Sequence, residues 1–104
     1  MIFRRGRFGE LVRRQLDLFA EDEDELLREL EVAERAYDTA EREDAEEAYG
    51  DLQLVYEAVF DRLGDVRDRY AQTMEDDSRR AYETTFDREA RRRYPRSFGR
   101  TSRP

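Results

Sequence analysis

The chain has 104 residues, of which 45% are charged and 38% are hydrophobic, so we expect one domain with a thin apolar core. It contains neither His nor Cys. This excludes the commonest general base, the best nucleophile, the usual zinc ligands and any disulfide. No apolar run approaches the roughly 20 residues of a membrane span. We therefore expect no enzyme activity, no membrane partner and a cytoplasmic location.

The 6 Phe and 6 Tyr recur at helical intervals, which favours a folded chain over a disordered one. A short first helix is predicted at about 8–19, where five residues share one face at helical spacing: Phe8, Leu11, Val12, Gln15 and Phe19. The acidic run 21–25 follows and suits the first turn of a second helix, because carboxylates favour its positive end. Asp22 and Glu25 would form a capping box there.

Two longer helices are predicted at about 22–42 and 45–74, each with an apolar seam of coiled-coil spacing. The first seam is Leu26, Leu30, Ala33, Tyr37 and Ala40. The second is Ala45, Tyr49, Leu52, Tyr56, Val59, Leu63, Val66 and Tyr70. At about 100° per residue, the two seams are offset by roughly a quarter turn. We therefore predict a turn near 41–44, with Asp44 and Glu47 as a second capping box, which makes the two helices antiparallel neighbours.

A last helix is predicted at about 78–93, capped by Ser78 or Asp77. Its apolar stripe is Tyr82, Phe86, Ala90 and Tyr94. Pro95 requires the helix to stop at or before the residue that precedes it. Strands are not expected, because the chain consists mostly of Ala, Leu, Glu and Arg, which are good helix formers.

Together these elements predict an all-α fold. It is an antiparallel helical hairpin, at about 22–42 and 45–74, flanked by shorter N- and C-terminal helices in a bundle-like arrangement. Residues 1–94 would form a single helical domain, and residues 95–104 a basic irregular tail. Because a two-helix seam buries little surface, the flanking helices or a second subunit must complete the core.

The net charge of −7 is unevenly distributed. Residues 1–14 hold five arginines and one acid, residues 88–104 hold seven arginines and one acid, and residues 15–87 hold 25 acids and 8 arginines. The basic ends offer candidate phosphate contacts: Arg4, Arg5, Arg7, Arg91, Arg92, Arg93 and Arg96. Binding of nucleic acid or the ribosome is therefore an alternative. It is not favoured, because the acidic body would repel phosphates and basic ends can lie on the protein's own acids.

A metal site is a second alternative. Four acids cluster at the predicted turn and could hold Ca²⁺ or Mg²⁺: Glu43, Asp44, Glu46 and Glu47. Their spacing is not that of an EF-hand, so a solvated, helix-capping role is favoured. We expect no cofactor and find no evident site for a small-molecule substrate.

Glycine inside a predicted helix needs an explanation, because it costs about 1 kcal/mol relative to Ala. Gly50 and Gly64 lie with Leu54 on the broad side of the third helix, away from its seam. They would let another helix approach closely, from this chain or from a second subunit. The candidate interface is Leu54, Phe60, Gly50, Gly64, Tyr82, Phe86, Tyr94 and Phe98. The sequence thus predicts a non-enzymatic interaction or structural module that binds a protein partner or forms a homodimer.

Overall fold

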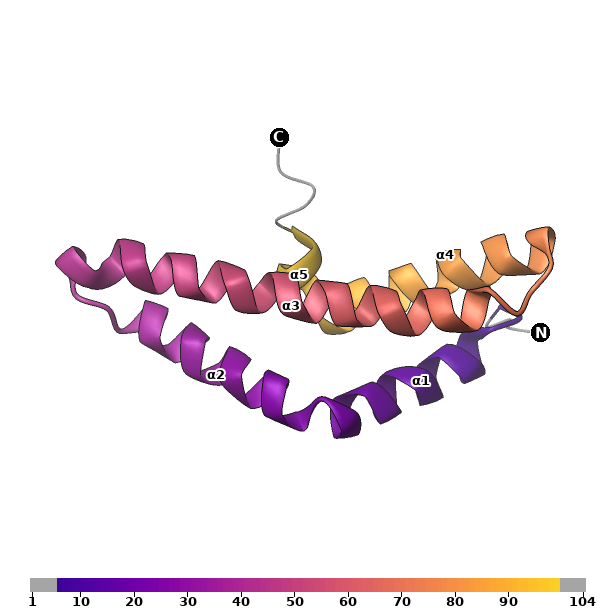
Figure 1. The fold of residues 1–104 in the computed structure, drawn as a ribbon, viewed down its shortest axis with the longest axis horizontal. Helices are drawn as coiled ribbons and strands as arrows, with labels where there is room; N and C mark the ends of the chain where they lie inside the picture. Colours follow the sequence, from indigo (N-terminus) through magenta and orange to yellow (C-terminus); the bar gives the residue numbers. More distant parts are fainter. Residues whose placement is uncertain (1–5, 100–104) are drawn as a thin grey trace.

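The computed structural model describes residues 6–99, which contain five α-helices and one short 3₁₀ helix (Figure 1). In chain order the elements are α1 (Gly9–Asp22), α2 (Asp24–Asp38), η1 (Arg42–Asp44), α3 (Ala45–Ala71), α4 (Asp76–Arg93) and α5 (Pro95–Gly99). Helices α2 and α3 pack together, and α1 packs against α4. The predicted all-α, bundle-like fold is confirmed.

The chain reverses between α2 and α3, as the offset between the two seams predicts. Helix α2 ends at Asp38, and the hydroxyl of Thr39 donates a hydrogen bond to the carbonyl oxygen of Arg35 at 2.9 Å. Glu41 is extended, with φ −70° and ψ 160°, and η1 then leads into α3. The turn therefore spans residues 39–44, and α2 and α3 form the predicted antiparallel hairpin (Figure 1).

A bend at Glu23 separates α1 from α2. Its backbone leaves the helical region, with φ −105° and ψ 33°. Hydrogen bonding continues through the bend, because the N–H of Glu23 donates to Phe19 at 2.8 Å and that of Leu27 donates to Glu23 at 2.9 Å. The Glu23 carboxylate also forms an ion pair with Arg62 of α3. The bend turns α1 towards α4 while α2 follows α3, so the two helices form a shallow V below α3 in Figure 1.

The core lies where α1, α4 and α5 meet the middle and the C-terminal part of α3. We call this region the core junction; its most buried members are Val12, Leu16, Phe19, Val59, Leu63, Tyr82, Phe86 and Ala90. The ring centroids of Tyr82 and Phe86 lie 6.0 Å apart, and the Tyr82 hydroxyl donates a hydrogen bond to Gln15 at 2.7 Å. Leu16 was not among the residues that the sequence placed on the buried face of the first helix.

The end of the chain differs from the prediction. Helix α4 ends at Arg93 as expected, but residues 95–99 form α5 and not an irregular tail. Proline suits the first position of a helix, because its fixed φ is helical and its missing N–H is not needed there. Phe98 then anchors α5, with its ring centroid 5.1 Å from that of Phe60. Residues 100–104 lie outside the described range.

The predicted side-chain caps do not form. Helix α2 begins after Glu23, α3 after Asp44 and α4 after Glu75, and none of these residues makes a side-chain capping hydrogen bond. Asp77 and Ser78 lie inside α4. Acidic residues still occupy the first turn of each of these helices, where they complement the positive helix end.

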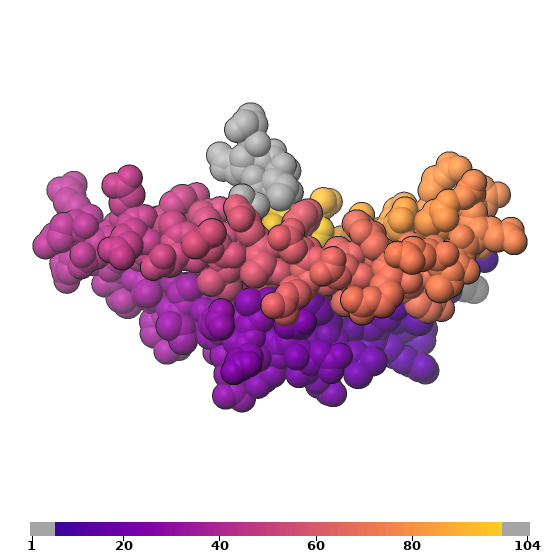
Figure 2. Space-filling model, viewed as in Figure 1, coloured from indigo at the N-terminus to yellow at the C-terminus, as the bar shows by residue number. Residues whose placement is uncertain are grey.

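The molecule is elongated, measuring 52 × 31 × 30 Å. Its radius of gyration of 16.0 Å exceeds the roughly 13 Å of a compact domain of this length. The cause is visible in the figures: one end of the α2–α3 hairpin extends beyond α4 and α5 (Figures 1 and 2). Among residues 6–99, no helix combines the length and the apolar character needed to cross a membrane.

Candidate functional site

The projecting end of the hairpin has no core of its own. We call residues 27–51 the distal arm; not one of them is buried. The side chain of Val32 is 64% exposed and that of Tyr49 is 49% exposed. Tyr49 contacts Tyr37 across the hairpin, with ring centroids 5.6 Å apart, and both rings stay open to solvent. The base of the arm still contacts the rest of the molecule, because Leu27 and Leu30 pack against the core and Glu34 pairs with Arg96 of α5. From residue 35 to residue 51 the arm lacks the third layer that α4 and α5 supply elsewhere.

A groove of about 890 Å³ runs along the distal arm between α2 and α3. Its floor consists of one valine and four alanines: Val32, Ala33, Ala36, Ala40 and Ala48. An alanine methyl group fills little space, so the two helix backbones stay accessible along this line. The apolar part of the groove consequently consists of small side chains and is open to solvent.

The edges of this groove are strongly acidic. Six carboxylates line it: Glu25, Glu29, Glu41, Asp44, Glu47 and Asp51. Arg28 is the single basic residue in the lining, and it forms an ion pair with Asp24 at 2.9 Å. A ligand in the groove would therefore meet an apolar floor between two rows of negative charge.

The predicted glycine-rich interface lies elsewhere on α3. A Cβ atom added to Gly50 would have no neighbour within 4 Å, and one added to Gly64 would meet only the Arg67 side chain at 3.9 Å. Leu54 is 65% exposed and does not line the groove. Among the described residues, no other helix of the chain comes within 4 Å of a Cβ atom built at either glycine.

The aromatic candidates of the interface belong to the core or pack against it: Phe60, Tyr82, Phe86, Tyr94 and Phe98. Tyr82 is 0% exposed and Phe86 is 1% exposed. The prediction that Tyr82, Phe86 and Phe98 contact a partner is wrong in this fold, because their side chains are buried within the chain itself. An apolar stripe shows which face of a helix is buried but not what covers it. Burial also raises the pKa of Tyr82 to about 12.

Two arginines that were proposed for phosphate binding contact acids of other helices. Arg93 pairs with Asp17 of α1 at 2.9 Å, and Arg96 pairs with Glu34 of α2 at 3.3 Å. The Tyr56 hydroxyl donates to the same Glu34 carboxylate at 3.1 Å. Burial raises the pKa of Tyr56, and hydrogen bonding to Tyr56 raises that of Arg96. The basic C-terminal region thus neutralises part of the acidic body.

The remaining phosphate candidates do not form one cluster. Arg7 donates to Ser78 at 3.3 Å, and its guanidinium lies over the Phe8 ring. Arg91 lies over the ring of Phe98 in α5, and Arg92 pairs with Glu89 at 3.7 Å. Arg4 and Arg5 lie outside the described residues. The structure does not bring the described arginines together into one phosphate-binding surface.

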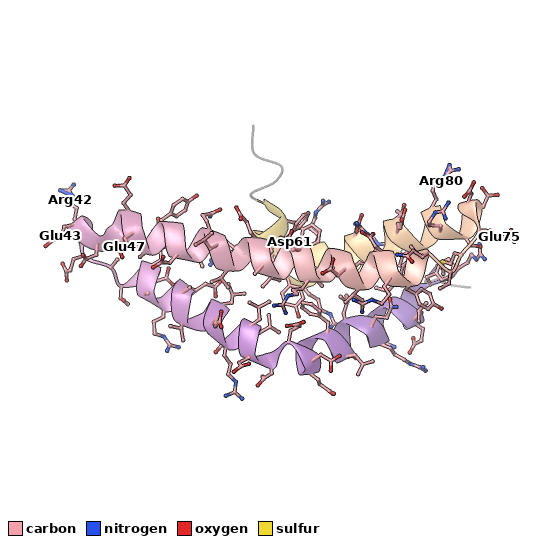
Figure 3. All side chains as sticks on the ribbon, viewed as in Figure 1. Arg42, Glu43, Glu47, Asp61, Glu75 and Arg80 are labelled. Atoms are coloured by element: carbon pink, nitrogen blue, oxygen red, sulfur yellow. The ribbon has the colours of Figure 1, made fainter. Side chains whose placement is uncertain are left out.

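The acids of the predicted turn do not converge on a metal site. Arg42 and Glu43 lie at the tip of the hairpin, at the opposite end of the molecule from Glu75 and Arg80 (Figure 3). Among residues 6–99, no three or more carboxylates are grouped so that they could hold a metal ion. The carboxylates of the distal arm instead spread along the edges of the groove.

Comparisons with protein families, curated proteins and solved structures find no match to this chain. The geometry of the molecule therefore carries the functional argument. The acidic groove was not predicted from the sequence, although the alanines at positions 33, 36, 40 and 48 and the flanking acids are present there. The signal that could have found it is the coincidence of small apolar residues with acids one turn away on both helices.

Proposed function

We propose that the chain is a non-enzymatic helical module that binds a protein partner, either another chain or a second copy of itself, through the distal arm. The observation that supports this most directly is the complete lack of buried residues from 27 to 51 in a well-formed hairpin. The cytoplasmic location expected from the sequence is part of the same proposal.

The energetics of the arm favour a partner. Burying apolar surface contributes roughly 25 cal/mol per Å², and the arm leaves Val32 and the alanine floor open to water. A helix laid along the groove would bury both at once, with little cost in backbone order because the arm is already helical. This corresponds to the helix-in-groove mode of peptide recognition.

Nucleic-acid binding is less well supported. Arg93 and Arg96 are engaged with Asp17 and Glu34, so these carboxylates already balance part of the positive charge that a phosphate would meet. The groove, with six carboxylates in its lining, would repel a phosphate backbone. Failure of the intact protein to be retained on polynucleotides at low salt is the expected result.

The proposal can be tested by comparing wild type with Val32→Arg, which places a charge on the groove floor. Leu18→Arg is the matched control, because Leu18 is also exposed but lies on α1. Sedimentation velocity reports self-association, and affinity capture from the native cell reports a partner. We expect one of the two to be lost in Val32→Arg and retained in Leu18→Arg, with helicity unchanged by circular dichroism.

The proposal fails if the protein is monomeric at all concentrations and wild type captures nothing that Val32→Arg does not. Equal losses in both variants would likewise contradict a role for the distal arm.

A further inference from the structure

We infer that the groove of the distal arm takes a basic amphipathic helix from a different protein. This inference rests on the proposed function and specifies its partner. The matching ligand has a stripe of small or medium apolar residues for the floor, and arginine or lysine on both flanks of that stripe.

Charge complementarity selects a basic partner. The lining holds six carboxylates and a single arginine, and that arginine already pairs with Asp24. A helix with basic residues on both sides of its apolar stripe would place a positive charge opposite each acidic edge. Such complementarity accelerates encounter and fixes the register of the bound helix, and it disfavours acidic or neutral competitors.

The dimensions of the groove also fit a helix. The groove follows α2 from Glu25 to the end of the helix at Asp38, about 20 Å at 1.5 Å per residue, and continues into the turn to Glu41. A ligand helix of about 16 residues is about 24 Å long and would cover this helical part and the start of the turn. Because Ala33, Ala36 and Ala40 are small, the axis of the ligand helix can come closer to the arm than bulkier side chains would permit.

A second copy of the chain does not satisfy these charges in the simplest dimer. A two-fold interface places the same patch on both sides, so six carboxylates would face six carboxylates. Electrostatic repulsion would thus weaken self-association through this groove at low salt, whereas a basic helix would bind most tightly at low salt. A metal ion is not a competing occupant, because the described carboxylates do not group around a common point.

The test uses the intact protein and a synthetic helical peptide of about 16 residues, with Ala and Leu at i, i+3, i+4 and i+7 and Arg on both flanks. The control peptide keeps the apolar stripe and carries Glu in place of Arg. Binding is measured by fluorescence anisotropy. We expect the basic peptide alone to bind, with affinity falling at least about tenfold between low and physiological salt.

Three variants locate the site. Glu47→Arg should weaken binding of the basic peptide about tenfold, since it reverses one charge on the edge of the groove. Asp61→Arg makes the same charge change on an exposed position of α3 outside the groove (Figure 3) and should have a much smaller effect. Ala36→Glu distinguishes docking in the groove from unspecific electrostatic attraction, because it makes the arm more acidic but obstructs the groove floor. The variant should keep its helix, since glutamate is a good helix former.

Docking in the groove predicts that Ala36→Glu weakens binding of the basic peptide. Stronger binding by Ala36→Glu, or equal losses in Glu47→Arg and Asp61→Arg, would show unspecific attraction and overturn the inference. If the basic peptide does not bind, but the protein self-associates and Ala36→Glu abolishes this, the inference is overturned while the proposed interaction function stands. If neither peptide binding nor self-association nor partner capture depends on the arm, both fall together.

Discussion

The same helix, α3, takes part in two regions with opposite properties. In the core junction it contributes Val59 and Leu63, which are almost completely buried in the core cluster. In the distal arm it contributes Ala45 and Ala48, which are only partly covered by α2. Helix propensity is high in both halves, so the backbone is helical throughout. The difference shows that stability in this fold comes from the layers that cover α3 and not from the helix itself.

Removing an aromatic side chain from the core should give the largest change in stability. Phe86→Ala takes away a side chain that is 1% exposed, and we expect a loss of about 3–5 kcal/mol in the free energy of unfolding. Tyr49→Ala in the distal arm should cost less than about 1 kcal/mol, because half of that side chain is already in water. Urea denaturation followed by circular dichroism measures both. Similar losses would contradict the contrast between the two regions.

Amide hydrogen exchange should show the same contrast without any mutation. We expect helical amides of residues 35–38 to exchange at least about 100-fold faster than those of residues 84–90, a difference of about 2.7 kcal/mol in opening free energy. The physical reason is that residues 35–38 are exposed and contribute no side chain to the core. Uniform protection along α2 and α4 would mean that the arm and the core junction open as one unit.

High pH should destabilise the core junction. Burial raises the pKa of Tyr82 to about 12 from the ordinary 10.0, so the folded state holds this proton more tightly than the unfolded state. The stabilisation is complete below about pH 10 and is lost as the pH rises towards 12. We expect a loss of about 1–2 kcal/mol over this range.

The matched variant for this measurement is Tyr82→Phe, which keeps the ring and removes the titrating group. Its stability should depend less on pH between about 10 and 12 than that of wild type. Some pH dependence of stability should remain in this variant, because burial also raises the pKa values of Tyr56 and Tyr94. An unchanged pH dependence in Tyr82→Phe would assign the effect to other groups.

The smallest effect should come from the glycine of the arm. Gly50→Ala adds a methyl group with no neighbour within 4 Å, so it should stabilise the protein by about 0.5–1 kcal/mol through helix propensity alone. Gly64→Ala makes only an ordinary contact with Arg67 and should give a similar gain. Only Gly50→Ala should slow hydrogen exchange in the distal arm. Slower exchange of the arm in Gly64→Ala would show that the two regions are coupled.

Much of the architecture was accessible from the sequence because it depends on local patterns. The offset between the seams located the turn, and Pro95 located the end of α4. The same patterns failed where the decisive contact is distant in sequence. Nothing near Phe98 indicates that α5 packs on Phe60, and an apolar stripe through Tyr82 and Phe86 is equally compatible with a core and with an interface.

By itself, the sequence determined that the chain is helical, where it turns back, and that it lacks the His and Cys on which most catalytic sites depend. These properties follow from residue type and short-range spacing. Only the tertiary structure decided that α4 and α5 cover one part of α3 and leave the rest open, and that the alanines and acids of the distal arm line one groove. Burial is a property of the whole packing arrangement, so no single helix carries that information.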